Sequence, residues 1–160
     1  MKSKIAKFSG IGYLIAVFAV GCVCAQDGQT GGGGRLSGTW DAVVTISDCA
    51  GGVPITANSI ASFNQGGTFI GSTGGIPQSL RTPEHGVWRH VKGNTYAFKF
   101  KSFSFLPSGA PNGWSIVEHQ LELDSDNNSY ASAGTARLFA PNGTQTGQRC
   151  SSAVGTRFEL

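Results

Sequence analysis

Short segments in which apolar and polar residues alternate recur along the chain, separated by clusters of Gly, Pro, Asn and Asp. Because successive side chains of a β-strand point to opposite faces, this alternation predicts strands with one buried face. No segment keeps a helical period for more than two turns. The pattern therefore predicts eight strands, at 36–47, 59–64, 68–72, 85–91, 95–105, 114–123, 129–140 and roughly 146–159.

Short turns join most of the predicted strands. Residues 65–67 (QGG), 92–94 (KGN) and 141–143 (PNG) are of the types that tight turns require. Consecutive hairpins form a meander, and closing a meander into a barrel removes the exposed edges of a flat sheet. We therefore predict an all-β fold, an eight-stranded antiparallel up-and-down barrel, with a two-sheet sandwich as the alternative.

The first 25 residues have the three parts of a secretory signal peptide. Three lysines precede an almost unbroken apolar run at 11–20, and residues 23–25 (VCA) offer a small-residue cleavage site. The apolar run is shorter than the ~20 residues that a transmembrane helix needs. We expect cleavage before Gln26, and a secreted or periplasmic mature chain without a transmembrane segment.

A second interpretation concerns Cys22. Residues 19–22 (AVGC) resemble a bacterial lipobox, in which the cysteine is lipidated and becomes the new N-terminus. The protein would then be a lipoprotein anchored at the outer membrane through Cys22. Residues 27–34 (DGQTGGGG) have no apolar side chain to bury, so 26–35 is predicted to be a flexible Gly-rich linker. Residues 36–160 then form a single barrel domain.

The balance of charge argues against a nucleic-acid partner. The chain has 12 Lys and Arg against 9 Asp and Glu, but three of the lysines lie in the predicted signal peptide. Nine residues of each sign remain after cleavage, so the mature chain has a formal charge of zero. Nucleic-acid-binding proteins need a basic surface to neutralise phosphates. We expect no such partner.

Cleavage before Gln26 leaves two cysteines, Cys49 and Cys150, and an even pair in an exported chain predicts a disulfide. If the two face each other in an antiparallel pair, Trp40 lies opposite Glu159 and diagonal to Arg157. The bond would join the first strand to the last and enclose a loop of about 100 residues, worth about 4–5 kcal/mol in the chain-entropy model. The mature chain has no CxxC motif or His/Cys cluster, which argues against structural zinc.

The first and last strands carry a known pattern. Gly38-Thr39-Trp40 near the start, with Arg157 near the end, resembles the calycin pattern of lipocalins and fatty-acid-binding proteins. In that superfamily the tryptophan packs under a basic residue of the final strand and closes one end of the barrel. The resemblance implies a lipocalin-like barrel in which Trp40 and Arg157 have this structural role.

A second resemblance covers most of residues 36–160. It is carried by Trp40, Asp48-Cys49, the runs 66–68 (GGT) and 81–88 (RTPEHGVW), and Cys150 with 155–159 (GTRFE). These residues resemble those of a group of small exported bacterial proteins with no assigned activity. The resemblance implies a bacterial secreted β-domain and no particular chemistry.

A candidate binding site lies on the inward faces of the strands. In 114–123 (WSIVEHQLEL), His119 shares a face with apolar residues, and aromatic residues of neighbouring strands are predicted to point inward as well. Such a histidine is either a core residue satisfied by a polar neighbour or a group that orients a ligand in a pocket. An eight-stranded barrel can equally be filled by its side chains. The predicted ligand-binding residues are Trp88, Tyr96, Phe98, Phe100, His119 and Tyr130.

No catalytic residue, metal site or cofactor is predicted. His85 and His90 lie five residues apart, so on one strand they point to opposite faces and cannot share a metal unless a bulge or loop lies between them. A three-residue turn after them would place Trp88 opposite Phe98, and a two-residue turn would shift every pair by one. The chain has no Gly-x-Ser-x-Gly, His-Glu-x-x-His or phosphate-loop motif.

These features lead to three hypotheses of function. The first is a monomeric barrel that binds a small apolar or amphipathic molecule inside. The second is a surface or envelope interaction protein with a filled core, which a lipid tether at Cys22 would favour. The third is a small enzyme of the cyclase or isomerase kind, with His119 or Tyr96 as its acid/base.

Overall fold

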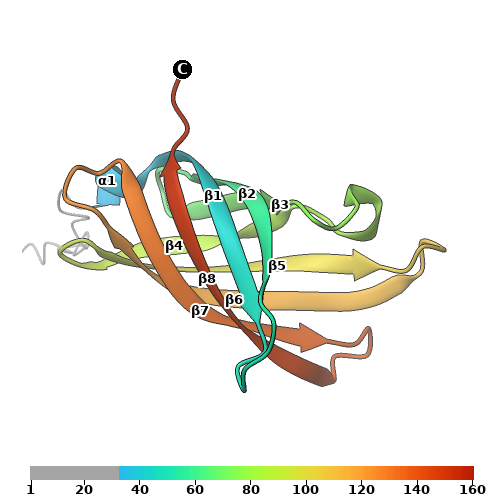
Figure 1. The fold of residues 1–160 in the computed structure, drawn as a ribbon. Helices are drawn as coiled ribbons and strands as arrows, with labels where there is room; N and C mark the ends of the chain where they lie inside the picture. Colours follow the sequence, from blue (N-terminus) through green and yellow to red (C-terminus); the bar gives the residue numbers. More distant parts are fainter. Residues whose placement is uncertain (1–32) are drawn as a thin grey trace, which may run out of the picture.

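The computed structural model describes residues 33–160, which form one closed antiparallel barrel (Figure 1). Each strand pairs with its neighbours in sequence, and β1 pairs with β8 to close the ring. The predicted up-and-down barrel is thus confirmed. Its elements are α1 (Gly33–Leu36), β1 (Gly38–Ser47), β2 (Ile55–Phe63), β3 (Thr68–Thr73), η1 (Gln78–Leu80), β4 (Glu84–Lys92), β5 (Thr95–Phe105), β6 (Pro111–Leu123), β7 (Ser129–Phe139) and β8 (Gln145–Arg157).

The predictions for the N-terminus fall mostly outside the described residues. The predicted signal peptide at 1–25, the lipobox cysteine Cys22 and residues 26–32 of the predicted linker all lie there. The last residues of that linker, 33–35, belong to the helical turn α1. Within residues 33–160, no helix is long and apolar enough to cross a membrane.

The disulfide between Cys49 and Cys150 is confirmed, with the two Cα atoms 4.9 Å apart. The register predicted from it was wrong by two residues. Trp40 lies directly opposite Arg157, and Cys150 lies opposite Ser47. The reason is that Cys49 follows the end of β1 and sits in the turn beyond it, so the bond reaches back to the ladder from outside.

The β4–β5 hairpin has the strand register that the three-residue turn predicts. Trp88 lies opposite Phe98 and His90 opposite Tyr96, and a bulge between His90 and Lys92 then leaves a tight turn. His90 Nε2 lies 2.8 Å from a backbone oxygen of this turn. His85 is exposed on the outer face. No cluster of three or more His, Cys, Asp or Glu side chains among residues 33–160 could hold a metal ion.

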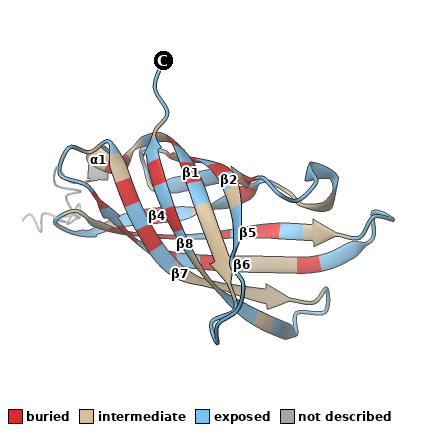
Figure 2. Cartoon of the chain, viewed as in Figure 1, coloured by how far each residue is buried: buried red, intermediate tan, exposed pale blue. Residues whose placement is uncertain are grey.

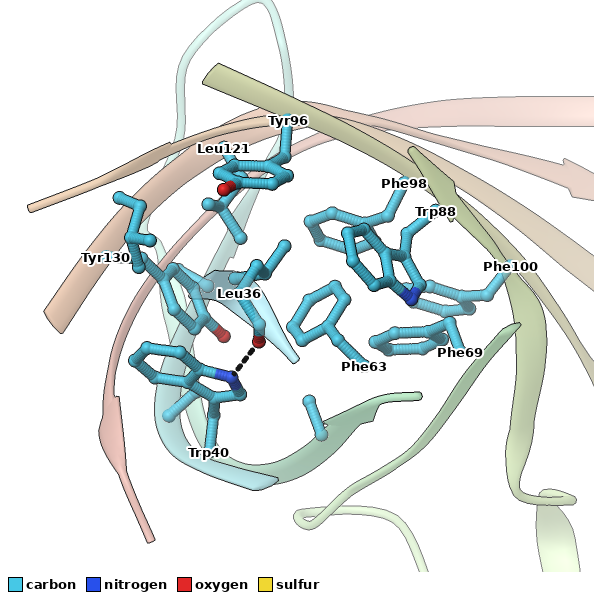
Figure 3. Packing of buried hydrophobic residues seen from close by; sticks show 14 of the residues in the cluster. Leu36, Trp40, Phe63, Phe69, Trp88, Tyr96, Phe98, Phe100, Leu121 and Tyr130 are labelled. Carbon is cyan, nitrogen blue, oxygen red and sulfur yellow. Dashed lines mark hydrogen bonds between the residues drawn. The ribbon is translucent and has the colours of Figure 1, made fainter. Parts of the chain in front are cut away.

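One end of the barrel is closed by α1 and a dense aromatic core (Figure 3), and Figure 2 shows buried segments of β1 and β7 at this end. Leu36, the last residue of α1, is fully buried among the barrel side chains. Its carbonyl accepts a hydrogen bond of 3.0 Å from the indole Nε1 of Trp40. The ring of Phe63 packs edge-on against the rings of Phe69, Trp88, Phe98 and Tyr130.

The Trp40–Arg157 pair lies at the same end. The guanidinium of Arg157 stands over the ring of Trp40 and donates hydrogen bonds to three backbone carbonyls. These carbonyls belong to Arg35, Ser37 and Asn127, so one side chain of the last strand holds both the α1 segment and the β6–β7 turn. Among the described residues, no helix or aromatic cluster of this kind closes the other end of the barrel.

Candidate functional site

The barrel contains a cavity of about 560 Å³ that runs from the aromatic core to the end opposite α1. Its size follows from the side chains that point inward. The strands β3 and β5 contribute phenylalanines, whereas β1, β2, β7 and β8 place alanines toward the interior. These small residues leave space that a uniformly large set would fill. The alanines are Ala42, Ala61, Ala136 and Ala153.

Four of the six predicted binding residues line this cavity: Phe98, Phe100, His119 and Tyr130. The rings of Phe98 and Phe100 stack against Phe69, with centroids 5.4 and 5.2 Å from it, and form one wall. This wall can contact the flat or extended apolar part of a ligand.

Trp88 and Tyr96 do not line the cavity. Both pack in the closed end, where their ring centroids lie 5.9 Å apart. Trp88 Nε1 donates to the carbonyl of Asn64 over 2.9 Å, and Tyr96 is fully buried. These two residues belong to the core that forms the base of the barrel.

His119 projects inward from β6 and lines the cavity, and both of its ring nitrogens form hydrogen bonds. Nδ1 lies 3.0 Å from the hydroxyl of Ser132 on β7, and Nε2 lies 2.7 Å from that of Ser151 on β8. Its ring is tilted against Phe98 at a centroid distance of 5.2 Å. Burial lowers the pKa of His119 to about 4, so the ring is neutral at physiological pH.

A row of polar side chains crosses another part of the cavity wall, and the sequence did not predict it. Arg81 Nη2 donates to Glu84 Oε1 over 2.9 Å, and Arg81 Nε donates to Ser102 over 3.1 Å. Thr73 donates to the same Oε1 over 2.8 Å. Bonds to Ser59 and Ser115 extend the row from β2 to β6. We call this set the polar row: Ser59, Thr73, Arg81, Glu84, Ser102 and Ser115.

Local backbone structure makes room for the polar row. Gly71 lies opposite Glu84 in the β3–β4 ladder, and a Cβ on Gly71 would lie 2.8 Å from Glu84 Oε2. Only glycine therefore leaves space for the carboxylate. Arg81 precedes Pro83 and is held against β5 by a bridge to Ser104, which aims its side chain into the barrel.

Glu84 is a buried carboxyl with one cationic partner. Desolvation raises its pKa, while the Arg81 guanidinium and the Thr73 hydroxyl partly oppose that rise. Burial, with a contribution from the charge of Glu84, raises the pKa of Tyr130 to about 12. The Arg81–Glu84 pair thus places hydrogen-bonding capacity in the cavity wall without net charge.

The open end is surrounded by apolar side chains. Exposed apolar residues lie on or next to the connections β1–β2, β3–β4 and β5–β6: Val53, Ile55, Ile76 and Leu106. The Trp114 ring stacks on the Phe139 ring at a centroid distance of 5.6 Å, and Lys101 Nζ lies 4.4 Å from the Trp114 ring. At the closed end, the turns 64–67, 93–94 and 124–128 are wholly polar. The mouth is therefore suited to the passage of an apolar molecule.

Comparison with known proteins adds a neighbour of unknown role. No protein-family model matches the chain, and no curated protein matches it. Among solved structures, it is similar to a protein of unknown function from the DUF3598 family of Nostoc punctiforme, with a TM-score of 0.41 and 11% identity. The similar region covers 79% of this chain and 49% of that one, so it spans about half of the neighbour's length.

Proposed function

We propose that the barrel binds a small apolar or amphipathic molecule in its cavity. The observation that carries this proposal is the cavity of about 560 Å³, a size within the ~300–1,000 Å³ range of ligand pockets. Its walls are mainly apolar, and two sets of polar groups, the polar row and His119 with its serines, provide hydrogen bonds.

The two other hypotheses have less support. A surface protein with a filled core does not agree with a cavity of this size. An enzyme with His119 as base requires an available ring nitrogen, and both nitrogens of His119 are engaged by Ser132 and Ser151. Tyr96, the other candidate acid/base, does not line the cavity.

The disulfide supports an oxidising compartment for this function. Such bonds form and persist in secreted and periplasmic proteins and are rare in the cytosol. The Cys49–Cys150 bond therefore supports a carrier that works in the periplasm or outside the cell.

The test is binding of the neutral apolar dye N-phenyl-1-naphthylamine, followed by its fluorescence. Ala136 points into the cavity, so Ala136→Trp fills it and is expected to weaken dye binding at least tenfold. Ala133 lies three residues away on the outer face of β7, and Ala133→Trp is the matched control with unchanged affinity. Absence of saturable binding, or an equal effect of both substitutions, would overturn the proposal.

A further inference from the structure

We propose that the cavity selects ligands with a neutral polar group, such as an alcohol or an amide, over ligands with a carboxylate. This inference rests on the proposed binding function and names the class of molecule that the cavity takes. It is carried by the pairing of charges in the cavity wall.

The Arg81–Glu84 pair offers both a donor and an acceptor to a ligand. A guanidinium has five N–H donors, and the two bonds of Arg81 to Glu84 and Ser102 do not use Nη1. Arg81 and Thr73 both donate to Oε1 of Glu84, so Oε2 remains able to accept a hydrogen bond from a ligand. A hydroxyl or amide can accept from the first group and donate to the second.

A carboxylate ligand would meet a less favourable site. It could reach Arg81 only by sharing the guanidinium with the carboxylate of Glu84, at a few ångströms from a like charge in a poorly solvated wall. Burying a second anion there without a cation of its own is costly. A neutral head group gains the same hydrogen bonds without that repulsion.

The second cation of the lining is paired as well. Arg149 lies at the mouth, and its Nη1 is 3.4 Å from Asp48 Oδ2. Arg81 and Arg149 are the two Arg or Lys side chains that line the cavity in the described part of the chain, and both face a carboxylate of the protein itself. The lining therefore has no cation reserved for an anionic ligand, which supports a neutral one.

The test compares decanol with decanoate as competitors of N-phenyl-1-naphthylamine at pH 8, where decanoate is ionised. We expect decanol to displace the dye at a concentration at least tenfold lower. Equal potency, or tighter binding of decanoate, would overturn the inference while dye binding itself still supports a ligand cavity. A protein that does not bind the dye removes the proposed function and this inference with it.

A pair of substitutions tests whether Glu84 is responsible. Glu84→Gln leaves Arg81 without its carboxylate, so decanoate is expected to bind at least tenfold better than to the wild type. Glu118→Gln makes the same chemical change in an exposed ion pair on the outer face of β6 and is expected to change the ratio less than threefold. If Glu84→Gln does not fold, the wild-type comparison decides alone. A folded Glu84→Gln protein that still prefers decanol tenfold would contradict the role of Glu84.

Discussion

Trp40 lies directly opposite Arg157 across the β1–β8 seam, and the guanidinium carbon of Arg157 is 4.4 Å from the centroid of the Trp40 ring. The two residues are 117 positions apart in the printed sequence, so this contact forms only when the barrel closes. Stacking covers the indole, and the guanidinium N–H groups satisfy carbonyls that closure brings together. The pair therefore connects ring closure to the sealing of one end.

Arg157→Lys is expected to lower the free energy of unfolding by about 2–4 kcal/mol, because an ammonium cannot reach three carbonyls in a fork or stack over the indole in the same way. Urea denaturation measures the change. Arg89→Lys, on the exposed face of β4, is the control and is expected to change stability by less than about 0.5 kcal/mol. Similar losses in the two variants would mean that the fork of bonds contributes little.

Asn127 is strained at the point where Arg157 holds the β6–β7 turn. Its backbone has φ 61°, and its side-chain Oδ1 is buried with no hydrogen-bond partner among residues 33–160. Asn127→Gly removes both costs and keeps the carbonyl that Arg157 binds. We expect this variant to be as stable as the wild type or more stable, by up to about 1 kcal/mol.

Asn127→Ala is the matched comparison, because it removes the same unpaired oxygen but keeps a Cβ in the left-handed conformation. It is expected to be about 1 kcal/mol less stable than Asn127→Gly in thermal or urea unfolding. An alanine variant as stable as the glycine variant would show that the turn relaxes to another conformation.

Alternation of apolar and polar residues predicted which face each strand buries, and the turn residues predicted the meander. That alternation does not predict how far along the barrel axis a side chain lies. Trp88 and Phe98 are paired and both point inward, yet only Phe98 reaches the cavity. The difference arises because α1 closes the end of the barrel at which Trp88 lies. The glycine-rich composition of residues 26–35 predicts a flexible linker and gives no sign of this helical turn.

The polar row escaped prediction for a similar reason. Arg81 and Glu84 flank Pro83 in a segment that the sequence presents as a loop, where charged residues are usually solvated. Only the β3–β4 register places Gly71 opposite Glu84 and so opens a buried space for the carboxylate. Single serines at inward positions, such as Ser102 in a run of phenylalanines, were the available signal.

His119 is expected to make the barrel less stable in mildly acidic solution. Burial lowers its pKa from 6.5 to about 4, so between these pH values the unfolded chain binds a proton that the folded chain does not. Stability from this source is complete above pH 6.5 and is lost as the pH falls toward 4. The full contribution is about 3 kcal/mol.

Glu84 acts in the opposite direction, because its raised pKa lets the folded chain keep a proton that the unfolded chain releases above pH 4.5. The contribution of His119 is therefore measured as a difference between the wild type and His119→Gln, in which that of Glu84 cancels. Gln can still bond Ser132 and Ser151 but does not titrate. Between pH 7.5 and 4.5, urea unfolding is expected to show the wild type losing about 2–3 kcal/mol more than the variant. Equal losses would mean that the folded barrel accommodates a charged His119, and that the two serines and nearby solvent stabilise the imidazolium despite its burial.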